Sequence, residues 1–287
     1  MDVKKAFIPA AGFGTRFLPQ TKAMPKELLP IVDTPALQYI VDEAINSGIT
    51  DILILLSPQK KAIIDYFSRN FELEEQLKKS SNWPALSRLQ SSVNKADIRF
   101  AFQDTMLGTG YAINYAAAWS AGEPFAVLFG DDVFKSTEPV TKQLIRAFSI
   151  TGTPILGVQK VAEPIARRCG VIEPGKIKGN IIEVKSIIEK PEGELPSPYA
   201  SLGRFIVTPE IFDAVKRTKP AKNGEINLTD ALSLLARETG VYACEFEGRR
   251  YDIGDKLGFI IANIEFGLSH PDTKSELIDY LSDLKKN

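Results

Sequence analysis

The first half of the chain alternates short apolar runs with segments of helical periodicity. The apolar runs occupy residues 5–9, 51–56, 98–102 and 125–129. Between the first two runs, the stretch PALQYIVDEAINSG repeats its apolar residues at helical spacing and stops at Gly48, a residue type that commonly follows a helix. A strand, a helix and a second strand at this spacing predict parallel strands joined by crossover helices.

Other stretches extend this pattern. GTGYAINYAAAWSAG predicts another helix, closed by Gly122, and residues 71–97 predict helices inserted before the third strand. The second half holds strand-like stretches separated by Pro, Gly and Asn, namely TPILGVQKV, CGVIE, NIIEVKSIIEK, YASLGRFIV and VYACEFEG. These predict a mixed or antiparallel extension of the same sheet. DTKSELIDYLSDLKK predicts a final helix with one apolar face, and we expect a single continuous α/β domain.

Composition excludes several classes of partner and site. A formal net charge of −1 gives no basic surface for nucleic acid or an anionic membrane. Cys169 and Cys244 have no metal-like spacing and are interpreted as reduced thiols of a cytoplasmic protein. The single histidine, His270, lies near a predicted helix end, which argues against histidine-based catalysis. No apolar run approaches the length of about 18 residues that a membrane span needs, and we expect no secretory signal.

A glycine loop follows the first predicted strand in KKAFIPAAGFGTRFLPQTKAMPKELLP. It begins like a dinucleotide fingerprint, but Phe17 replaces the third glycine and prolines interrupt the segment where a helix would begin. The Walker pattern is also absent. Backbone amides around Gly12 and Gly14 can still form an anion-binding nest. Arg16 and Lys26 add cations nearby, so phosphate binding is favoured over a glycine turn with solvated cations.

Acidic residues end two predicted strands. Asp131 and Asp132 follow the apolar strand in AVLFGDDVF, and Asp252 lies in RRYDIGD. Carboxylates at the carboxyl ends of parallel strands lie where α/β sheets bind ligands, and Mg²⁺ takes one or two carboxylates. The alternative is an Asp pair that caps the following turn. The residues alone leave both interpretations open.

Two further signals are weaker. Glu189 and Lys190, in IIEKPEG, can hold a sugar hydroxyl and a phosphate, although a surface salt bridge before a turn is the commoner use of such a pair. In FQDTMLGTGYA, Gln103 offers a donor and an acceptor that suit a nucleobase edge. Gly108 permits close backbone approach there. The default interpretation of that stretch is a helix-entry turn.

Taken in order, these motifs resemble those of the bacterial UTP–glucose-1-phosphate uridylyltransferases (UDP-glucose pyrophosphorylases), a branch of the sugar-nucleotidyltransferases. The resemblance runs from residue 4 to about residue 268 and is most specific in PAAGFGTRFLPQTKAMPKELLPIVDTPALQYIVDEA. The stretches EPFAVLFGDDVF, EKPEG, GRFIVTPEIFD, GEINLTDAL and FEGRRYDIGDKLGFIIANIEF follow in the family's order. The resemblance implies a Rossmann-like three-layer α/β/α sandwich with a mixed, mainly parallel central sheet and a β-rich sugar-binding insertion.

The activity implied by the resemblance is transfer of a uridylyl group from UTP to glucose 1-phosphate, with Mg²⁺ as cofactor. The products are UDP-glucose and pyrophosphate. The resemblance also implies a cytoplasmic homodimer or homotetramer. Within the single domain it implies a nucleotide-binding part at about 1–135, a sugar-binding part at about 150–255 and C-terminal helices at about 256–287.

The resemblance further implies roles for individual residues. Nucleotide binding is implied for Ala11, Gly12, Gly14, Thr15, Glu27, Gln103 and Gly108. Sugar binding is implied for Gly170, Glu189, Lys190 and Gly203. The implied catalytic cations are Arg16 at the leaving pyrophosphate, Lys26 at the α-phosphate and Lys190 at the sugar phosphate. Mg²⁺ is expected at Asp131 and Asp252.

Some positions depart from the family's pattern. Gly130 is more like the thymidylyltransferase branch, Cys169 replaces a usual aromatic residue, and MLGTGYA replaces a lysine-containing segment. An enzyme of the same fold that uses dTTP therefore stays open, as does a non-catalytic regulatory homologue. An NAD-dependent dehydrogenase is disfavoured by the missing third glycine and by the prolines that follow the loop.

Overall fold

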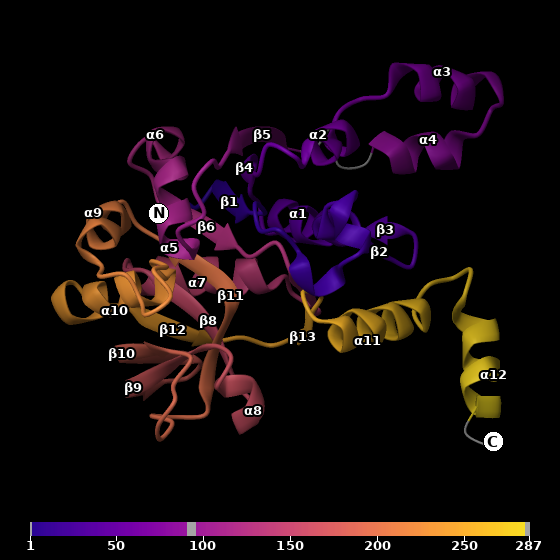
Figure 1. The fold of residues 1–287 in the computed structure, drawn as a ribbon. Coiled ribbons are helices and arrows are strands. Elements are labelled where there is room, and N and C mark those ends of the chain that lie inside the picture. Colours follow the sequence, from indigo (N-terminus) through magenta and orange to yellow (C-terminus); the bar gives the residue numbers. More distant parts are fainter. Residues whose placement is uncertain (1, 91–95, 285–287) are drawn as a thin grey trace.

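A nine-stranded sheet runs through the centre of the molecule (Figure 1). The computed structural model describes residues 2–90 and 96–284. The strands from the first half of the chain are β1 (Lys5–Pro9), β4 (Asp51–Leu56), β5 (Asp97–Phe102) and β6 (Phe125–Leu128). Those from the second half are β8 (Ile155–Lys160), β9 (Gly170–Lys178), β10 (Ile181–Glu189), β11 (Tyr199–Val207) and β12 (Tyr242–Glu245). Every strand predicted from an apolar run is thus confirmed.

The sheet is mixed, in the order β5-β4-β1-β6-β11-β8-β12-β10-β9. Its first four strands are parallel, as predicted from the crossover helices. β11 then pairs antiparallel with both β6 and β8, while β12 is parallel to β8. The sheet ends in the antiparallel pairs of β10 with β12 and with β9. The second half of the chain therefore extends the same sheet with mixed pairing.

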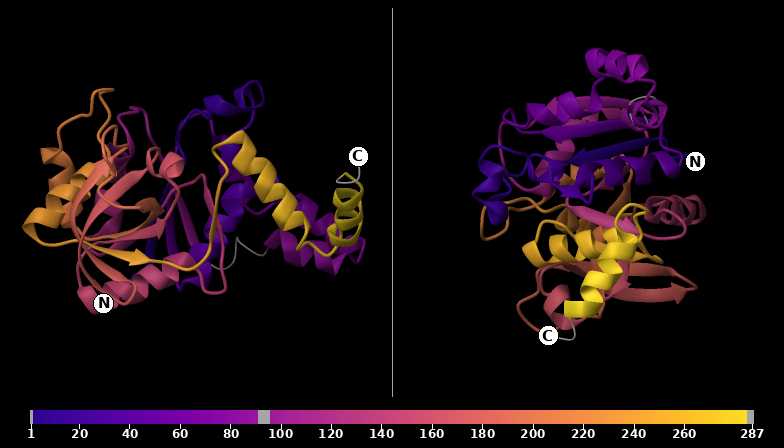
Figure 2. Two further views of the ribbon diagram at one scale, coloured as in Figure 1. Left: turned by 90° about the horizontal axis from the view of Figure 1, so that it is seen from below. Right: turned by 90° about the vertical axis from the view of Figure 1, so that its right-hand side faces the viewer.

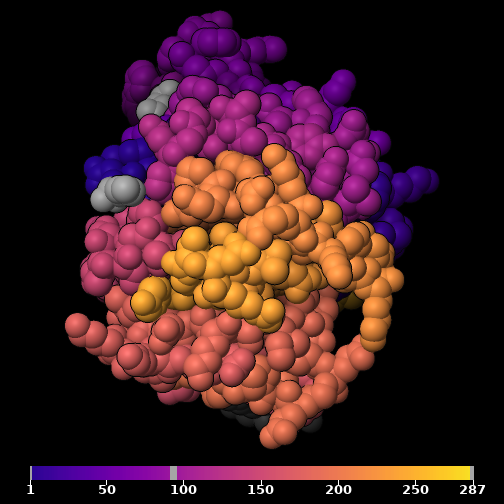
Figure 3. All heavy atoms as spheres, turned by 90° about the vertical axis from the view of Figure 1, so that its left-hand side faces the viewer, coloured from indigo at the N-terminus to yellow at the C-terminus, as the bar shows by residue number. Residues whose placement is uncertain are grey.

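Helices cover both faces of this sheet, which confirms the three-layer fold (Figure 2). Alternate residues of β1 separate the two cores, because Ala6 and Ile8 belong to one core and Phe7 to the other. One face carries α1 (Ala36–Asn46) and α7 (Val140–Thr151). The opposite face carries α5 (Thr109–Ile113), α9 (Glu210–Arg217) and α10 (Leu228–Glu238). Figure 3 shows the surface of one side of the molecule, where the orange segment that includes α9 and α10 lies between the N-terminal half and the β9–β10 region.

Most predicted helices are present, with one correction. Helix α1 is followed by Gly48 with φ of 89°, as predicted. The helix predicted up to Gly122 is broken, because a 3₁₀ turn at Asn114–Ala116 separates α5 from α6 (Ala117–Ser120). Asparagine is a poor helix former that favours caps and turns, which is consistent with a break at this point. The left-handed stop begins one residue earlier than predicted, at Ala121 with φ of 53°.

Two helical appendages project from the body (Figure 1). The insertion before β5 contains α3 (Phe71–Lys79) and α4 (Trp83–Gln90), as predicted, and residues 91–95 of that stretch lie outside the described residues. The last helices of the described residues are α11 (Lys256–Gly267) and the predicted α12 (Lys274–Leu284). Within the described ranges, no helix combines the length and apolar character needed to cross a membrane.

Short elements complete the fold around the ends of the main strands. They are α2 (Lys61–Phe67), α8 (Glu163–Ala166), β2 (Pro30–Ile31), β3 (Thr34–Pro35), β7 (Asp132–Lys135) and β13 (Arg249–Asp252). The antiparallel pair of β7 and β13 places Asp132 opposite Asp252. Acidic residues separated by more than 100 positions in sequence therefore come together at one end of β6.

Candidate active site

A cavity of about 880 Å³ lies at the carboxyl ends of the parallel strands. Its walls include Pro9 and Ala10 at the end of β1, Gln103 after β5 and Phe129 after β6. The opposite wall comes from β9, β10 and β11. Each residue that the sequence singled out for nucleotide, sugar, metal or catalysis lines this cavity. The structure therefore brings the whole predicted set to one place, where open α/β sheets usually bind ligands.

The glycine loop presents backbone donors to the cavity. Gly14 adopts a left-handed φ of 67°, and a Cβ at Gly12 would meet nothing within 4 Å. The amides of Gly12, Phe13 and Gly14 donate no hydrogen bond to any other described residue. The loop continues into a three-residue 3₁₀ turn, Thr15–Phe17, in place of the helix of a dinucleotide fold. It therefore has the unpaired amides that an anion nest requires.

The two predicted cations of this region differ in their partners. Lys26 Nζ lies 2.6 Å from Asp131 Oδ2. Burial opposes the charge of Lys26, but Asp131 raises the pKa of this lysine above its usual value. Burial likewise opposes the charge of Asp131, but Lys26 lowers the pKa of that carboxyl. Both groups are therefore ionised near neutral pH, while Arg16 donates from Nη1 to the carbonyl of Gly254 at 3.4 Å.

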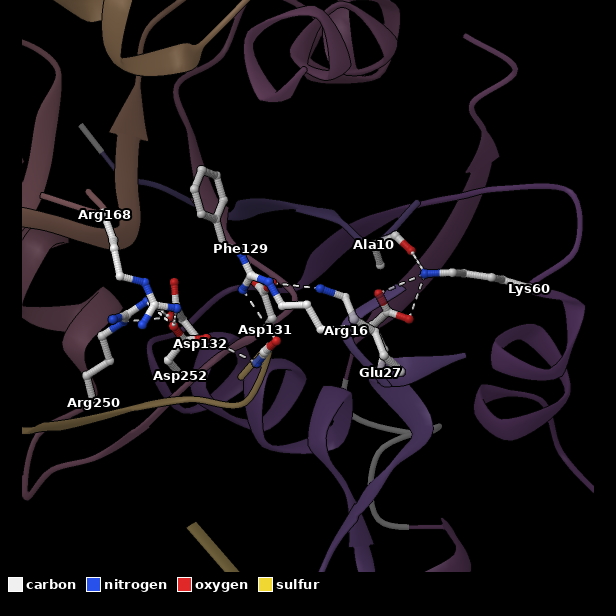
Figure 4. Close-up of polar contacts among 12 residues, drawn as sticks. Ala10, Arg16, Glu27, Lys60, Phe129, Asp131, Asp132, Arg168, Arg250 and Asp252 are labelled. Carbon is white, nitrogen blue, oxygen red and sulfur yellow. Dashed lines mark hydrogen bonds and ion pairs between the residues drawn. The ribbon is translucent and has the colours of Figure 1, made fainter. Parts of the chain in front are cut away.

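Asp131 and Asp252 approach one point from two sides. A Cβ built on Gly254 would lie 2.9 Å from Asp131 Oδ2 and 3.2 Å from Asp252 Oδ1. Figure 4 shows these carboxylates beside Asp132 and Arg250. Two converging carboxylates suit Mg²⁺, which completes its shell with water and phosphate oxygens. No group of three or more acidic, histidine or cysteine side chains within the described ranges is arranged to hold a metal by itself.

Asp132 is committed to a different contact. Its Oδ1 accepts a hydrogen bond from Arg250 Nε at 2.6 Å, and its side chain is buried. Burial raises the pKa of Asp132 to about 6, although Arg250 acts against this shift. The residues alone could not separate Asp131 from Asp132 as a metal ligand. The geometry favours Asp131, because its side chain is 35% exposed beside the cavity, whereas that of Asp132 is 4% exposed and pairs with Arg250.

Gly203 packs against the carboxylate of Asp132. A Cβ at this position would lie 2.0 Å from Asp132 Oδ2, and the φ of Gly203 is 68°. Both the backbone conformation and the space exclude a side chain here. The contact of Gly203 with glucose stays a prediction, whereas its need to be glycine has a direct physical cause.

The sugar side of the cavity is built on the end of β10. Glu189 Oε2 accepts a hydrogen bond from Thr229 Oγ1 at 2.8 Å, and burial raises the pKa of Glu189. Gly170 leaves room for this pair, because a Cβ there would lie 2.8 Å from the methyl carbon of Thr229. The next residue, Lys190, has a φ of 44°, and its amide donates to the carbonyl of Cys169 at 3.0 Å. A lysine held in this sparsely populated conformation is typical of a functional site.

The base side of the cavity contains Gln103 and Gly108. Gln103 is buried and donates from Nε2 to the carbonyl of Thr105 at 2.8 Å, which fixes the orientation of its amide. Gly108 has a φ of 93°, and a Cβ there would lie 2.6 Å from the carbonyl oxygen of Ile226. Helix α5 can therefore approach the segment before α10 closely only because this entry residue is glycine.

Lys60 lies beside this region and was not identified from the sequence. Both carboxylate oxygens of Glu27 lie 2.8 Å from Lys60 Nζ, which also donates to the carbonyl of Ala10 at 2.6 Å. Figure 4 shows this buried group apart from the Asp131 group. Glu27 is 1% exposed, so its carboxylate is satisfied within the protein. Lys60 lies in SPQKKA, which carries no recognisable motif, and only the tertiary structure identifies it.

Arginines also line the cavity beside the predicted residues. Arg168 Nη2 lies 3.8 Å from Asp252 Oδ2 and 4.0 Å from Asp255 Oδ1. Arg250 lies between Asp132 and Asp252, at 2.6 Å and 3.8 Å from their carboxylate oxygens. The signal available in the sequence was a basic pair beside each motif, RRCG and RRYD. These arginines balance an acidic cluster that would otherwise repel itself.

Comparison with known proteins gives a consistent result. The model of the nucleotidyl transferase family matches residues 5–266. A UTP–glucose-1-phosphate uridylyltransferase of Staphylococcus haemolyticus is 46% identical over 284 residues, which are 99% of each chain. A crystal structure of UDP-glucose pyrophosphorylase complexed with UDP-glucose is 36% identical with a TM-score of 0.85, covering 94% of this chain and 100% of that one. A UTP-bound UGPase from Acinetobacter baumannii is 31% identical with a TM-score of 0.91, covering 99% of this chain and 100% of that one.

Proposed function

The chain belongs to the nucleotidyl transferase family, and we propose that it is a UTP–glucose-1-phosphate uridylyltransferase. It transfers the uridylyl group of UTP to glucose 1-phosphate and releases pyrophosphate. The observation that carries this proposal is the 46% identity, over 99% of both chains, to a protein with that name. The convergence of every motif on one cavity supports it further.

Each substrate is assigned to one side of the cavity. The part at about 1–135 holds UTP, with the glycine loop around the phosphates and Gln103 and Gly108 beside the uracil. Because Gln103 Nε2 is used by Thr105, its Oε1 is left as an acceptor for the N3–H of the base. The part at about 150–255 holds glucose 1-phosphate, with the sugar beside Gly170, Glu189 and Gly203.

The reaction is a single displacement at phosphorus. A phosphate oxygen of glucose 1-phosphate forms a bond to the α-phosphorus of UTP. The bond from that phosphorus to the bridging oxygen breaks on the opposite side, and the electron pair leaves with pyrophosphate. The nucleophile is already an anion at neutral pH, so no residue has to remove a proton. Positioning and electrostatic stabilisation therefore supply the catalysis.

The cations of the cavity match this requirement. Lys190 neutralises the attacking sugar phosphate, and Lys26 lies at the α-phosphate. Arg16 holds the leaving pyrophosphate, which suits the planar donor set of a guanidinium. The unpaired amides of the glycine loop, including those of Gly12 and Gly14, bind the remaining phosphate oxygens. Together these groups lower the repulsion between two anionic substrates.

We assign Mg²⁺ as the cofactor, with Asp131 and Asp252 as its protein ligands. When bound, the ion would supply positive charge that stabilises phosphate oxygens in the cavity. The approach of both carboxylates to Gly254 supports this assignment, as does the contact of Lys26 with Asp131, which keeps that carboxylate ionised.

The assembly and location are part of the same proposal. We expect a homodimer or homotetramer, and the exposed apolar side chains of α12, such as Ile278 and Leu284, are consistent with association. We expect a cytoplasmic protein, and both cysteines are free thiols in the structure.

A product assay tests the proposal. The protein is incubated with Mg²⁺, UTP and glucose 1-phosphate, and UDP-glucose and pyrophosphate are quantified separately. Equal amounts of the two products are expected, and chelation of the metal should stop both. Phosphate release from UTP without UDP-glucose, or no product at all, would contradict the proposed function.

A further inference from the structure

Arg204 lies in the middle of β11 and is the largest fully buried side chain among the described residues. Every nitrogen of its guanidinium has an acceptor. Nε and Nη2 donate to the carboxylate of Glu43, at 3.1 Å and 2.8 Å. Nη1 donates to the carbonyls of Gly203 and Phe129, at 3.1 Å and 3.5 Å, and Nη2 also donates to the carbonyl of Asp132 at 2.7 Å.

Two of these carbonyls belong to the ends of one tight turn. Phe129 and Asp132 flank Gly130 and Asp131, and the amide of Asp132 also donates to the carbonyl of Phe129 at 3.3 Å. One rigid guanidinium therefore spans the turn that carries Asp131. On the other side of the turn, the amide of Ile253 donates to the carbonyl of Asp131 at 3.0 Å. The backbone of Asp131 is thus fixed between Arg204 and the segment that carries Asp252.

The rest of the environment neutralises Arg204 and holds it still. Glu43 compensates its charge and is itself held by Thr141, whose amide and hydroxyl donate to Glu43 Oε1 at 3.0 Å and 2.6 Å. The ring of Phe134 lies 4.5 Å from the guanidinium carbon. A well-packed apolar pair often stabilises a core as well as a buried ion pair does. Stability alone therefore does not explain an arginine here, whereas the geometry of the turn does.

We propose that Arg204 is a positioning residue, which holds the turn between β6 and β7 so that Asp131 faces Asp252. The inference rests on the proposed function in one respect, the assignment of these carboxylates to the metal. Lysine cannot replace arginine in this role, because a single ammonium does not span two carbonyls and a carboxylate in fixed directions.

The test compares Arg204→Lys with Thr141→Val. The first variant keeps the positive charge beside Glu43 but loses the planar set of donors that contacts the turn. The second removes a hydrogen bond from the same buried network and leaves the turn intact. Two measurements are made on each folded protein. The first is Mn²⁺ binding without nucleotide, detected by electron paramagnetic resonance. The second is the rate of pyrophosphate release as a function of Mg²⁺ concentration.

Arg204→Lys is expected to weaken Mn²⁺ binding and to raise the Mg²⁺ concentration for half-maximal rate by about 10- to 100-fold, as for other residues that orient metal ligands. The KM for glucose 1-phosphate should stay near the wild-type value. Thr141→Val should lower the melting temperature and leave both metal measurements unchanged. The proposal would be overturned if the two variants had the same Mn²⁺ affinity and the same Mg²⁺ requirement.

A second variant covers a failure to fold. The double substitution Glu43→Gln with Arg204→Gln removes the buried charges together, and the same metal defect is expected from it. If the wild-type protein binds Mn²⁺ but forms no UDP-glucose, the proposed function is wrong. The comparison of Mn²⁺ binding among the variants would still decide the role of Arg204. Wild-type protein that neither binds Mn²⁺ nor turns over would overturn both proposals.

Discussion

At the scale of single residues, Lys190 combines exposure with a constrained backbone. Its side chain is 61% exposed and reaches no closer than 3.7 Å to Glu189 Oε1, so its ammonium is available to a ligand. Its left-handed φ of 44° is maintained by the hydrogen bond from its amide to Cys169. A surface salt bridge, which was the alternative interpretation of the Glu189–Lys190 pair, would need no such conformation. The geometry therefore favours the sugar-phosphate role.

Lys190→Ala should remove most of the activity. Loss of one well-placed charge typically costs on the order of 10²–10³ in rate, and the KM for glucose 1-phosphate should rise as well. Initial rates over a range of sugar-phosphate concentrations measure both effects. Lys222→Ala is the matched control, because Lys222 is 91% exposed and contacts Glu192 in the segment after Lys190. Turnover near the wild-type rate in Lys190→Ala would refute the proposed clamp.

Asp131→Asn should abolish most Mg²⁺-dependent turnover, because an amide is a poor ligand for a hard cation. The measurement is the rate of pyrophosphate release as Mg²⁺ is raised. Asp132→Asn is the informative comparison. Its carboxylate pairs with Arg250, so this substitution should lower thermal stability and change the Mg²⁺ requirement much less. If the two variants exchanged these phenotypes, Asp132 would be the metal ligand.

The predicted residues that reach the cavity are those whose chemistry and chain position are linked locally. The glycine loop and the residues that end strands, such as Asp131, Glu189 and Lys190, all reach the cavity. Sequence-based prediction missed Lys60, which meets Glu27 across 33 positions of sequence, and Arg204, which meets Glu43 across 161. Such partners are determined by packing, and a single sequence carries no local signal for them.

At the scale of elements, strand prediction was accurate because most strands of the main sheet contain an apolar run between turn residues. The exception is β9, which continues past its apolar start through Pro174 and Gly175. The helix expected up to Gly122 was not predicted accurately, since its apolar pattern is unchanged by the 3₁₀ turn at Asn114–Ala116. The irregularity of β11 was also unpredictable. Its pairing with β8 shifts register between Ser201 and Phe205, around the left-handed Gly203. At this point the strand packs against the carboxylate of Asp132, which lies far away in sequence.

Gly203→Ala should destabilise the protein by about 2 kcal/mol or more, because a left-handed conformation and a clash with Asp132 act together. Gly179→Ala provides the control. Gly179 has a similar φ of 63°, but a Cβ there meets nothing within 4 Å, so only the conformational cost of about 1 kcal/mol applies. Urea unfolding of both variants isolates the clash as the difference between them. Equal losses of stability would mean that Asp132 moves aside without cost.

At the scale of the whole molecule, one sheet connects the two proposed substrate sides. The parallel half, β5-β4-β1-β6, ends at the glycine loop and at Asp131, while β9, β10 and β11 carry the proposed sugar residues. β11 lies between β6 and β8 in the sheet, although it follows both of them in sequence. Strand prediction could give the existence of a mixed extension, but the order of its strands depends on long-range pairing. That order places Gly203 beside the turn of Asp131.

The molecule as a whole also fits a reaction without a general base. His270 lies 3.6 Å from Asp33, and neither residue lines the cavity. The polar groups that do line it are mainly arginines, lysines, carboxylates and backbone amides. Such a set can position and neutralise phosphates, and it contains no histidine. This composition is expected for phosphoryl-type transfer to an anionic nucleophile.

The most direct test of the central claim is the choice of substrates. The protein is supplied with Mg²⁺, one of UTP, dTTP, CTP, ATP or GTP, and one of several sugar 1-phosphates, and pyrophosphate release is measured for each pair. UTP with glucose 1-phosphate is expected to give the highest kcat/KM. A preference for dTTP would assign the chain to thymidylyl transfer, and no release with any pair would contradict a catalytic function.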